Sequence, residues 1–219
     1  MIRLERVTKG FKSGRTTHYV VRDVSYTIER GQSIGLLGRN GAGKSTLLRL
    51  IAGIIQPDKG RVRREAKVSW PLGFAGSFAG SLTGEQNVRF VARIYGVDTE
   101  ELTEYVEEFA ELGDQFRKPV SGYSSGMKAR LAFGISMGIQ FDYYLIDETL
   151  AVGDVNFKRK CQEVFTDKLS NSDVIMVSHQ TSAIRNYCDR ALVLEDGKLT
   201  FFENIEEAIE FHNRTLSIR

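Results

Sequence analysis

A glycine-rich stretch between an apolar run and a helical pattern constrains the fold of this chain more than any other feature. Residues 32–37 form a short apolar run that predicts a buried strand, and residues 44–54 repeat apolar side chains at helical spacing. The connecting segment contains glycine, four further residues and then Gly-Lys-Ser-Thr. Such a loop turns its main-chain N–H groups inward beside a helix N-terminus, so it predicts a phosphate-binding site.

Each part of this loop has an expected task. We expect Lys44 to neutralise the β- and γ-phosphates of a nucleotide, and the Ser45 hydroxyl to bind Mg²⁺. The predicted phosphate contacts are Gly38, Arg39, Asn40, Gly41, Ala42, Gly43, Lys44, Ser45 and Thr46.

Further polar residues follow two other short apolar runs. The run Phe-Asp-Tyr-Tyr-Leu-Ile ends in Asp147 and Glu148, and the run Val-Ile-Met-Val-Ser ends at His179. Asp147 is expected to hold Mg²⁺, and Glu148 is expected to orient the attacking water and accept its proton. His179 emerges at the same carboxyl edge of the sheet, where we expect it to reach the γ-phosphate as a second catalytic residue.

Hydrophobic periodicity predicts one α/β domain, residues 1–219, with a mostly parallel sheet. Its expected core covers residues 1–75 and 140–219 and carries an antiparallel β subdomain, whereas residues 76–139 form an inserted helical subdomain. The expected strands are 2–8, 19–28, 60–70 in short pieces, 142–147, 173–178, 191–194 and 198–202, with a loop at 12–17. The expected helices are 85–95 with Thr83 as N-cap, 99–112, one from Ser124, 157–169, 181–188 and 205–212.

Composition limits which binding partners and which cellular compartment are expected. The net charge of +2 is too small to argue for nucleic acid or a membrane surface, and we expect no nucleic-acid partner. Cys161 and Cys188 lack metal-binding or redox spacing, so they are expected to be reduced thiols. No run approaches the roughly 20 apolar residues that span a bilayer. The chain is therefore expected in the cytoplasm, reaching a membrane only through a partner.

The segment Tyr-Ser-Ser-Gly-Met-Lys-Ala-Arg at residues 123–130 opens a predicted helix and resembles the Leu-Ser-Gly-Gly-Gln signature of ABC ATPases. With the phosphate loop before it and the acidic pair and His179 after it, the resemblance covers essentially the whole chain. It implies a P-loop NTPase (RecA-like) fold, ATP and Mg²⁺ as ligands, and a head-to-tail dimer of two identical copies. In that dimer Ser124, Ser125 and Gly126 would contact ATP held by the other copy.

The resemblance also implies roles for residues outside the main motifs. Asp154 falls where the aspartate of the family's D-loop crosses the dimer interface. Phe11 falls where an aromatic ring stacks on adenine, although Tyr19 is a rival for that role. The chain departs from the family at the Q-loop, where residues 70–84 contain no glutamine, and at Thr149, where a proline is usual.

Several segments resemble the branch of the family that exports capsular polysaccharides and polyol phosphates. They are the signature itself, Asp-Glu-x-Leu-Ala-Val-Gly-Asp and Leu-Thr-Gly-x-x-Asn. This branch implies a separate transmembrane permease and a peripheral position at the cytoplasmic face of the inner membrane. Trp70, Phe74 and Phe78 are candidate contacts for that permease, and a role in the subdomain core is equally open.

Other functions compete with this interpretation. The exported glycan could instead be an O-antigen or a teichoic acid, because a motor subunit need not touch its cargo. A soluble ABC ATPase usually carries two cassettes or a long coiled coil, and the chain has neither sustained heptads nor the length. If the chain were a small-molecule kinase, its match to the signature and the presence of His179 would be coincidences. The absence of Asn-Lys-x-Asp argues against a GTPase.

Overall fold

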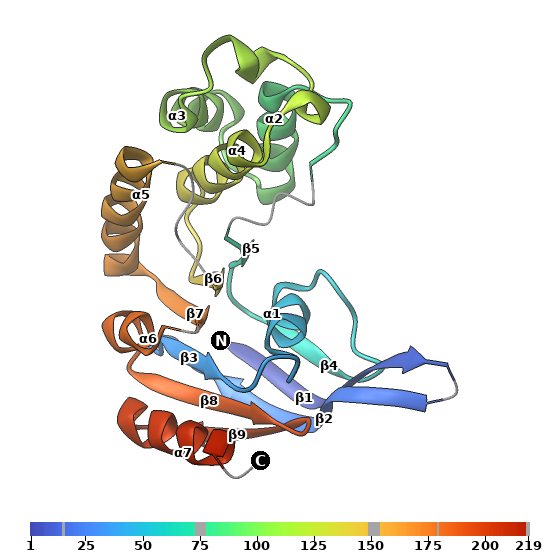
Figure 1. Cartoon of the computed structure of the whole chain (residues 1–219). Helices are drawn as coiled ribbons and strands as arrows, with labels where there is room; N and C mark the ends of the chain where they lie inside the picture. Colours follow the sequence, from blue (N-terminus) through green and yellow to red (C-terminus); the bar gives the residue numbers. More distant parts are fainter. Residues whose placement is uncertain (15, 73–77, 149–153, 179, 218–219) are drawn as a thin grey trace. The chain divides into compact units, whose positions relative to one another are not determined.

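The computed structural model describes residues 1–14, 16–72, 78–148, 154–178 and 180–217. Its chain divides into two compact units. The first unit comprises Met1–Pro71, Phe141–Glu148 and Asn171–Arg219, and the second comprises Leu72–Gln140 and Thr149–Ser170. Two sheets make up most of the first unit, whereas the second is built from helices (Figure 1).

The larger sheet of the first unit has six strands in the order β5-β6-β7-β3-β8-β9. Neighbours from β5 to β8 are parallel, and β9 pairs antiparallel with β8, which confirms the mostly parallel sheet. The strands are β3 (Ile34–Leu37), β5 (Val68–Pro71), β6 (Tyr143–Asp147), β7 (Asp173–Val177), β8 (Arg190–Glu195) and β9 (Lys198–Phe202). Strands β3, β6 and β7 are apolar and buried, as expected of parallel strands covered on both faces.

The smaller sheet of the first unit is antiparallel, with strand order β2-β1-β4. Its strands are β1 (Ile2–Ser13), β2 (Thr16–Ile28) and β4 (Lys59–Arg64). The loop expected at residues 12–17 is wrong, because the pairing of β1 with β2 continues through Lys12 with Thr17 and Ser13 with Thr16. Both faces of this hairpin end are exposed, so no apolar alternation marks it in the sequence.

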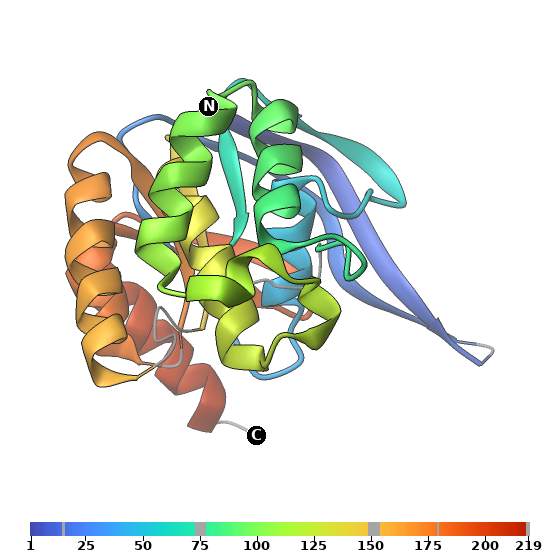
Figure 2. The same cartoon turned by 90° about the horizontal axis from the view of Figure 1, so that it is seen from above.

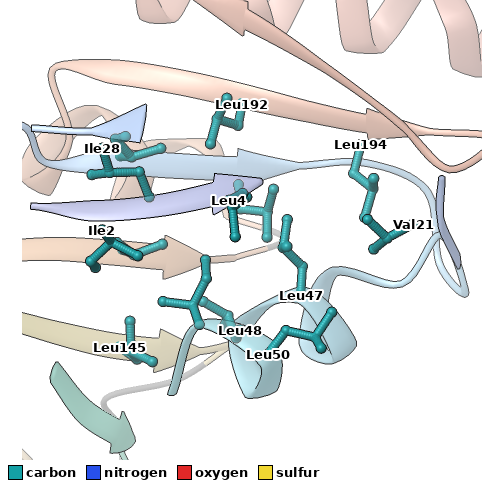
Figure 3. Packing of buried hydrophobic residues seen from close by; sticks show 14 of the residues in the cluster. Ile2, Leu4, Val21, Ile28, Leu47, Leu48, Leu50, Leu145, Leu192 and Leu194 are labelled. Carbon is teal, nitrogen blue, oxygen red and sulfur yellow. The ribbon is translucent and has the colours of Figure 1, made fainter. Parts of the chain in front are cut away.

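Helix α1 (Lys44–Ala52) packs between the two sheets, and its apolar side chains form one core with both (Figure 3). Its Leu47, Leu48 and Leu50 meet Ile2 and Leu4 of β1 and residues of β6 and β8. The same unit contains α6 (Thr181–Tyr187) and α7 (Ile205–Ser217), which is longer than expected. The phosphate loop is thus anchored at both ends in this buried core.

The second unit contains α2 (Gly84–Tyr95), α3 (Thr99–Ala110), α4 (Ser125–Gly138) and α5 (Val155–Lys168). Short 3-10 turns lie at Gly113–Arg117, Val120–Gly122 and Leu169–Asn171. Helices α2, α3 and α4 pack side by side (Figures 1 and 2), which confirms the three expected helices. Thr83 is the N-cap of α2 and forms a capping box with Gln86. Among the described residues, none of the helices is long and apolar enough to cross a membrane.

Candidate functional site

The glycine-rich loop opens directly into the first turn of α1. Gly43 is the N-cap, with φ 105°, and no side chain caps the helix. A Cβ atom on Gly43 would lie 2.6 Å from Cβ of Val20, so only glycine fits both the conformation and the space. The first main-chain N–H groups of a helix have no partner within it, so this uncapped N-terminus suits an anion.

Lys44 is folded back over the loop that precedes it. Its Nζ donates to the carbonyl oxygen of Gly38 at 2.7 Å and of Arg39 at 3.0 Å, and the residue is 8% exposed. Burial lowers the pKa of Lys44, while the nearby carboxylates of Glu148 and Asp147 act in the opposite direction. The ammonium group is therefore held at the loop by two neutral acceptors, which a phosphate could replace with a stronger, charge-assisted bond.

Ser45 and Asp147 are 102 residues apart in the sequence and meet in the structure. Oγ of Ser45 donates to Oδ1 of Asp147 at 3.0 Å, since α1 begins beside the carboxyl end of β6. A hydroxyl and one carboxylate are hard oxygen donors that suit Mg²⁺, an ion that usually keeps several waters and shares phosphate oxygens. The described residues hold no group of three or more His, Cys, Asp or Glu that could bind a metal by itself. The donor set thus fits Mg²⁺ brought in with a nucleotide.

Glu148 follows β6 in an unusual backbone conformation. Its φ is +74°, which is rare for a residue with a Cβ, and its N–H donates to the carbonyl oxygen of Val177 at 2.8 Å. The residue lines a cleft of about 500 Å³ together with Lys44 and Ser45. Backbone strain of this kind persists only where the surrounding structure enforces it, and it concentrates at functional sites.

The two rival aromatic residues line different cavities. Phe11 is 48% exposed and lines the same cleft as Lys44 and Glu148. Tyr19 is 38% exposed, lies under the guanidinium of Arg22 at 5.2 Å, and lines a separate cavity of about 310 Å³ that includes neither Lys44 nor Glu148. The shared cleft therefore favours Phe11 as the residue that stacks on a nucleotide base.

In the second unit, the predicted signature lies at the N-terminus of α4. Oγ of Ser124 accepts a hydrogen bond from the Met127 N–H at 3.2 Å, so Ser124 is the N-cap. Ser124, Ser125 and Gly126 are all exposed. The Ser124 hydroxyl, which accepts this bond through its oxygen, keeps its hydrogen for donation to a ligand.

Asp154 caps α5 and connects it to α4. Its Oδ1 accepts from the N–H groups of Asn156 and Phe157, each at 3.0 Å, and its Oδ2 accepts from Nη2 of Arg130 at 2.7 Å. The hydrogen bond from the Phe157 N–H, followed by the charge of Arg130, holds the pKa of Asp154 below its usual value.

Arg130, at the end of the signature segment, was not predicted as a site residue from the sequence. It also pairs with Glu111 at 3.2 Å and lies 4.2 Å from the centre of the Phe157 ring. Arg130 thereby fixes the signature helix against its neighbours within the second unit.

Three residues that the sequence analysis singled out lie outside the described residues. They are Phe74, Thr149 and His179. Trp70 is half-buried and packs edge to face on Phe141 within the first unit, with ring centres 5.7 Å apart. Phe78 is half-buried in the second unit.

Comparison with known proteins agrees with this geometry. The family profile described as ABC transporter matches residues 21–151. The capsule polysaccharide export ATP-binding protein CtrD of Neisseria meningitidis serogroup B is 49% identical over 97% of this chain and 99% of its own length. The polysialic acid transport ATP-binding protein KpsT of Escherichia coli is 49% identical over 99% of this chain and 100% of its own length.

A solved structure shows the same fold. The ATP-binding cassette MJ0796, solved as a dimer in a post-hydrolysis state with ADP and phosphate bound, superposes with a TM-score of 0.73 at 21% identity. The alignment covers 91% of this chain and 96% of that one.

Proposed function

Because this chain belongs to the ABC transporter family, we propose that it is the ATP-binding and ATP-hydrolysing subunit of an exporter that moves capsular polysaccharide across the inner membrane. One observation supports the binding and hydrolysis of ATP: Lys44, Ser45 and Glu148 line one cleft, and Asp147 is hydrogen-bonded to Ser45. Relatives that match over nearly their full length and are named for capsule polysaccharide export and polysialic acid transport support the substrate class.

In the proposed mechanism, ATP enters the cleft with its phosphates on the glycine-rich loop. The N–H groups of residues 38–46 and the uncapped N-terminus of α1 bind the phosphate oxygens. Lys44 exchanges its two carbonyl acceptors for the β- and γ-phosphates. Phe11 stacks on the adenine ring from the rim of the same cleft.

Ser45 and Asp147 are the residues that would hold Mg²⁺. The ion neutralises phosphate charge and orients the γ-phosphate when it is bound. Glu148 accepts a proton from the attacking water, whose oxygen bonds to the γ-phosphorus as the bond to the β-phosphate oxygen breaks. The products are ADP and inorganic phosphate. We also propose His179 as a second residue beside the γ-phosphate.

The site is completed by a second copy of the chain. Ser124, Ser125 and Gly126 of that copy present a hydroxyl and helix N-terminal N–H groups to the γ-phosphate, which is the same chemistry as at α1. Asp154 lies at the same interface. Its carboxylate is already oriented by its capping bonds and by Arg130. ATP binding therefore draws two copies together, and hydrolysis releases them.

We further propose that a transmembrane permease binds this subunit at the cytoplasmic face of the inner membrane. Closure and opening of the ATP-bound dimer would then drive the permease.

Complementation of a deletion strain tests the transport function. In the native host, loss of the gene should leave capsular polysaccharide inside the cell, and wild-type protein should restore it to the surface. Lys44→Ala, expressed at the same level, should fail to restore it because phosphate binding is weakened. Normal surface capsule in the deletion strain, with another surface glycan lost instead, would contradict the proposed substrate class.

A further inference from the structure

The small net charge of the chain conceals a strong separation of charge along the sequence. Residues 1–67 contain 15 Lys and Arg against 5 Asp and Glu, out of 30 and 28 in the whole chain. The rest of the chain is correspondingly acidic. Charge asymmetry of this size indicates an anionic partner for the basic part.

The excess is concentrated on the three-stranded sheet of the first unit. Arg3 and Glu5 of β1 lie opposite Arg63 and Arg61 of β4 in the antiparallel register. Side chains alternate along a strand, and Leu4 between them points into the core, so these four residues lie on the outer face of the sheet. We call Arg3, Glu5, Arg61 and Arg63 the outer sheet face. Arg6 and Lys59, both exposed, lie beside it.

The outer sheet face contains three arginines and one carboxylate. Glu5 pairs with Arg61 and also with Arg63 at 3.1 Å, and the two arginines still have 63% and 49% of their side chains exposed. One carboxylate cannot neutralise three guanidinium groups, so this face keeps a positive charge. Charged side chains on the edge strand β4 also discourage pairing with other chains, but Arg3 lies on the central strand β1, where that explanation does not apply.

We infer that the outer sheet face binds the anionic phospholipid surface of the membrane beside which the chain works. This inference rests on the proposed function, which places the chain beside a bilayer. The sheet presents these side chains together on one face, and arginine donates several hydrogen bonds to phosphate groups. None of the large exposed hydrophobic residues among the described residues lies on this face, which indicates electrostatic adsorption without insertion.

Nucleic acid is the other anionic partner to consider. Sites for single-stranded nucleic acid combine basic residues with exposed aromatic rings, and those for duplexes place an element in a groove. The outer sheet face has no aromatic residue, since the exposed Phe11 and Tyr19 lie at the far end of the hairpin. The bilayer surface is therefore the better match.

Sedimentation with lipid vesicles tests this inference. The full chain should bind vesicles of phosphatidylcholine and phosphatidylglycerol at low salt, should bind far less to phosphatidylcholine alone, and should be released as salt rises. The double variant Arg61→Gln/Arg63→Gln should bind anionic vesicles more than tenfold more weakly, because each arginine near the surface contributes about fivefold. The matched control Lys158→Gln/Arg159→Gln loses the same charge from the exposed surface of α5 and should bind within about twofold of wild type.

A second variant keeps the test decisive if the double variant folds poorly. Glu5→Gln removes the one carboxylate of the face and should bind anionic vesicles more tightly than wild type, with an unchanged thermal melt. Equal binding by the double variant and its control, or unchanged binding by Glu5→Gln, would overturn the inference. So would duplex DNA that displaces the vesicles at equal phosphate concentration.

The same preparations separate this inference from the proposed function. ATP hydrolysis without lipid depends on the proposed catalytic centre, which consists of the cleft and the signature of a second copy, and not on Arg61 or Arg63. If the protein hydrolyses ATP but does not bind anionic vesicles, only the inferred lipid binding is contradicted. If it binds these vesicles but has no ATPase activity, only the proposed function is contradicted.

Discussion

Lys44 and Glu148 lie in one cleft, and each is held there by the main chain. Lys44 donates to two carbonyl oxygens of the loop that it follows, and Glu148 is placed by a left-handed backbone conformation at the end of β6. The motifs alone predicted both residues and their tasks. The left-handed backbone at Glu148 could not be predicted, because the motif specifies residue types and not dihedral angles.

If Glu148 is the general base, its replacement should slow ATP hydrolysis without weakening ATP binding. Glu148→Gln preserves shape and hydrogen-bonding capacity but cannot accept a proton, so ATP affinity should stay within about threefold while kcat falls by about 100-fold or more. Steady-state ATPase assays alongside nucleotide-binding titrations would measure both quantities. A variant that hydrolyses ATP at the wild-type rate would contradict the role of Glu148.

The two cysteines should be chemically inert in the folded protein. Cys161 and Cys188 are buried, and burial raises the pKa of each thiol to about 12. Because only the thiolate reacts, neither should be labelled by a thiol reagent at pH 8 until the chain is unfolded. A colorimetric thiol titration of native and urea-unfolded protein checks this, and rapid labelling of either cysteine in the native state would disagree.

At the scale of elements, sequence periodicity worked where at least one face of an element is buried. It placed β9 at the correct bounds and β3, β6, β7 and β8 within one or two residues, whereas β5 only overlaps the short pieces expected at residues 60–70. It failed at the end of the β1–β2 hairpin, where neither face is buried and hydrogen bonding alone continues the strands. The start of α2 was identified through Thr83 because a capping residue is a local signal.

The Asn of the segment Leu-Thr-Gly-x-x-Asn has a structural task at that same helix start. Asn87 is 2% exposed, accepts from the N–H of Ala79 at 3.0 Å, and donates to the carbonyl oxygens of Ala79 and Thr83 at 3.2 and 2.9 Å. It therefore fastens the segment before α2 onto the helix. The sequence linked Asn87 only to a branch of the family, and the structure shows that its side chain holds the main chain at the start of α2.

Replacing this side chain should destabilise the protein. Asn87→Leu leaves the Ala79 N–H without its acceptor and removes the side-chain bonds to the Ala79 and Thr83 carbonyl oxygens, which keep their main-chain donors, at a cost of about 1–3 kcal/mol in the free energy of unfolding. The matched control Asn156→Leu, on the exposed first turn of α5, should change it by no more than about 0.5 kcal/mol. Urea denaturation of both variants gives the comparison, and equal midpoints would contradict this role.

At the scale of the whole molecule, the site within one chain is only part of the proposed catalytic centre. The first unit contains the phosphate loop, the proposed Mg²⁺ ligands and the proposed general base, and the second unit presents Ser124, Ser125 and Gly126 at an exposed helix N-terminus. Sequence motifs predicted both halves. The separation of charge between the first 67 residues and the rest was missed because a net charge averages over the chain.

The central claim is that ATP joins two copies of this chain by lying between the phosphate loop of one and the signature of the other. Light scattering during gel filtration of Glu148→Gln measures this directly, because we expect the variant to bind ATP and to hydrolyse it very slowly. We expect the 24.6 kDa monomer without nucleotide and a species of twice that mass with ATP and Mg²⁺. Lys44→Ala/Glu148→Gln should remain monomeric in both conditions. A Glu148→Gln variant that binds ATP and still elutes as a monomer would contradict the account.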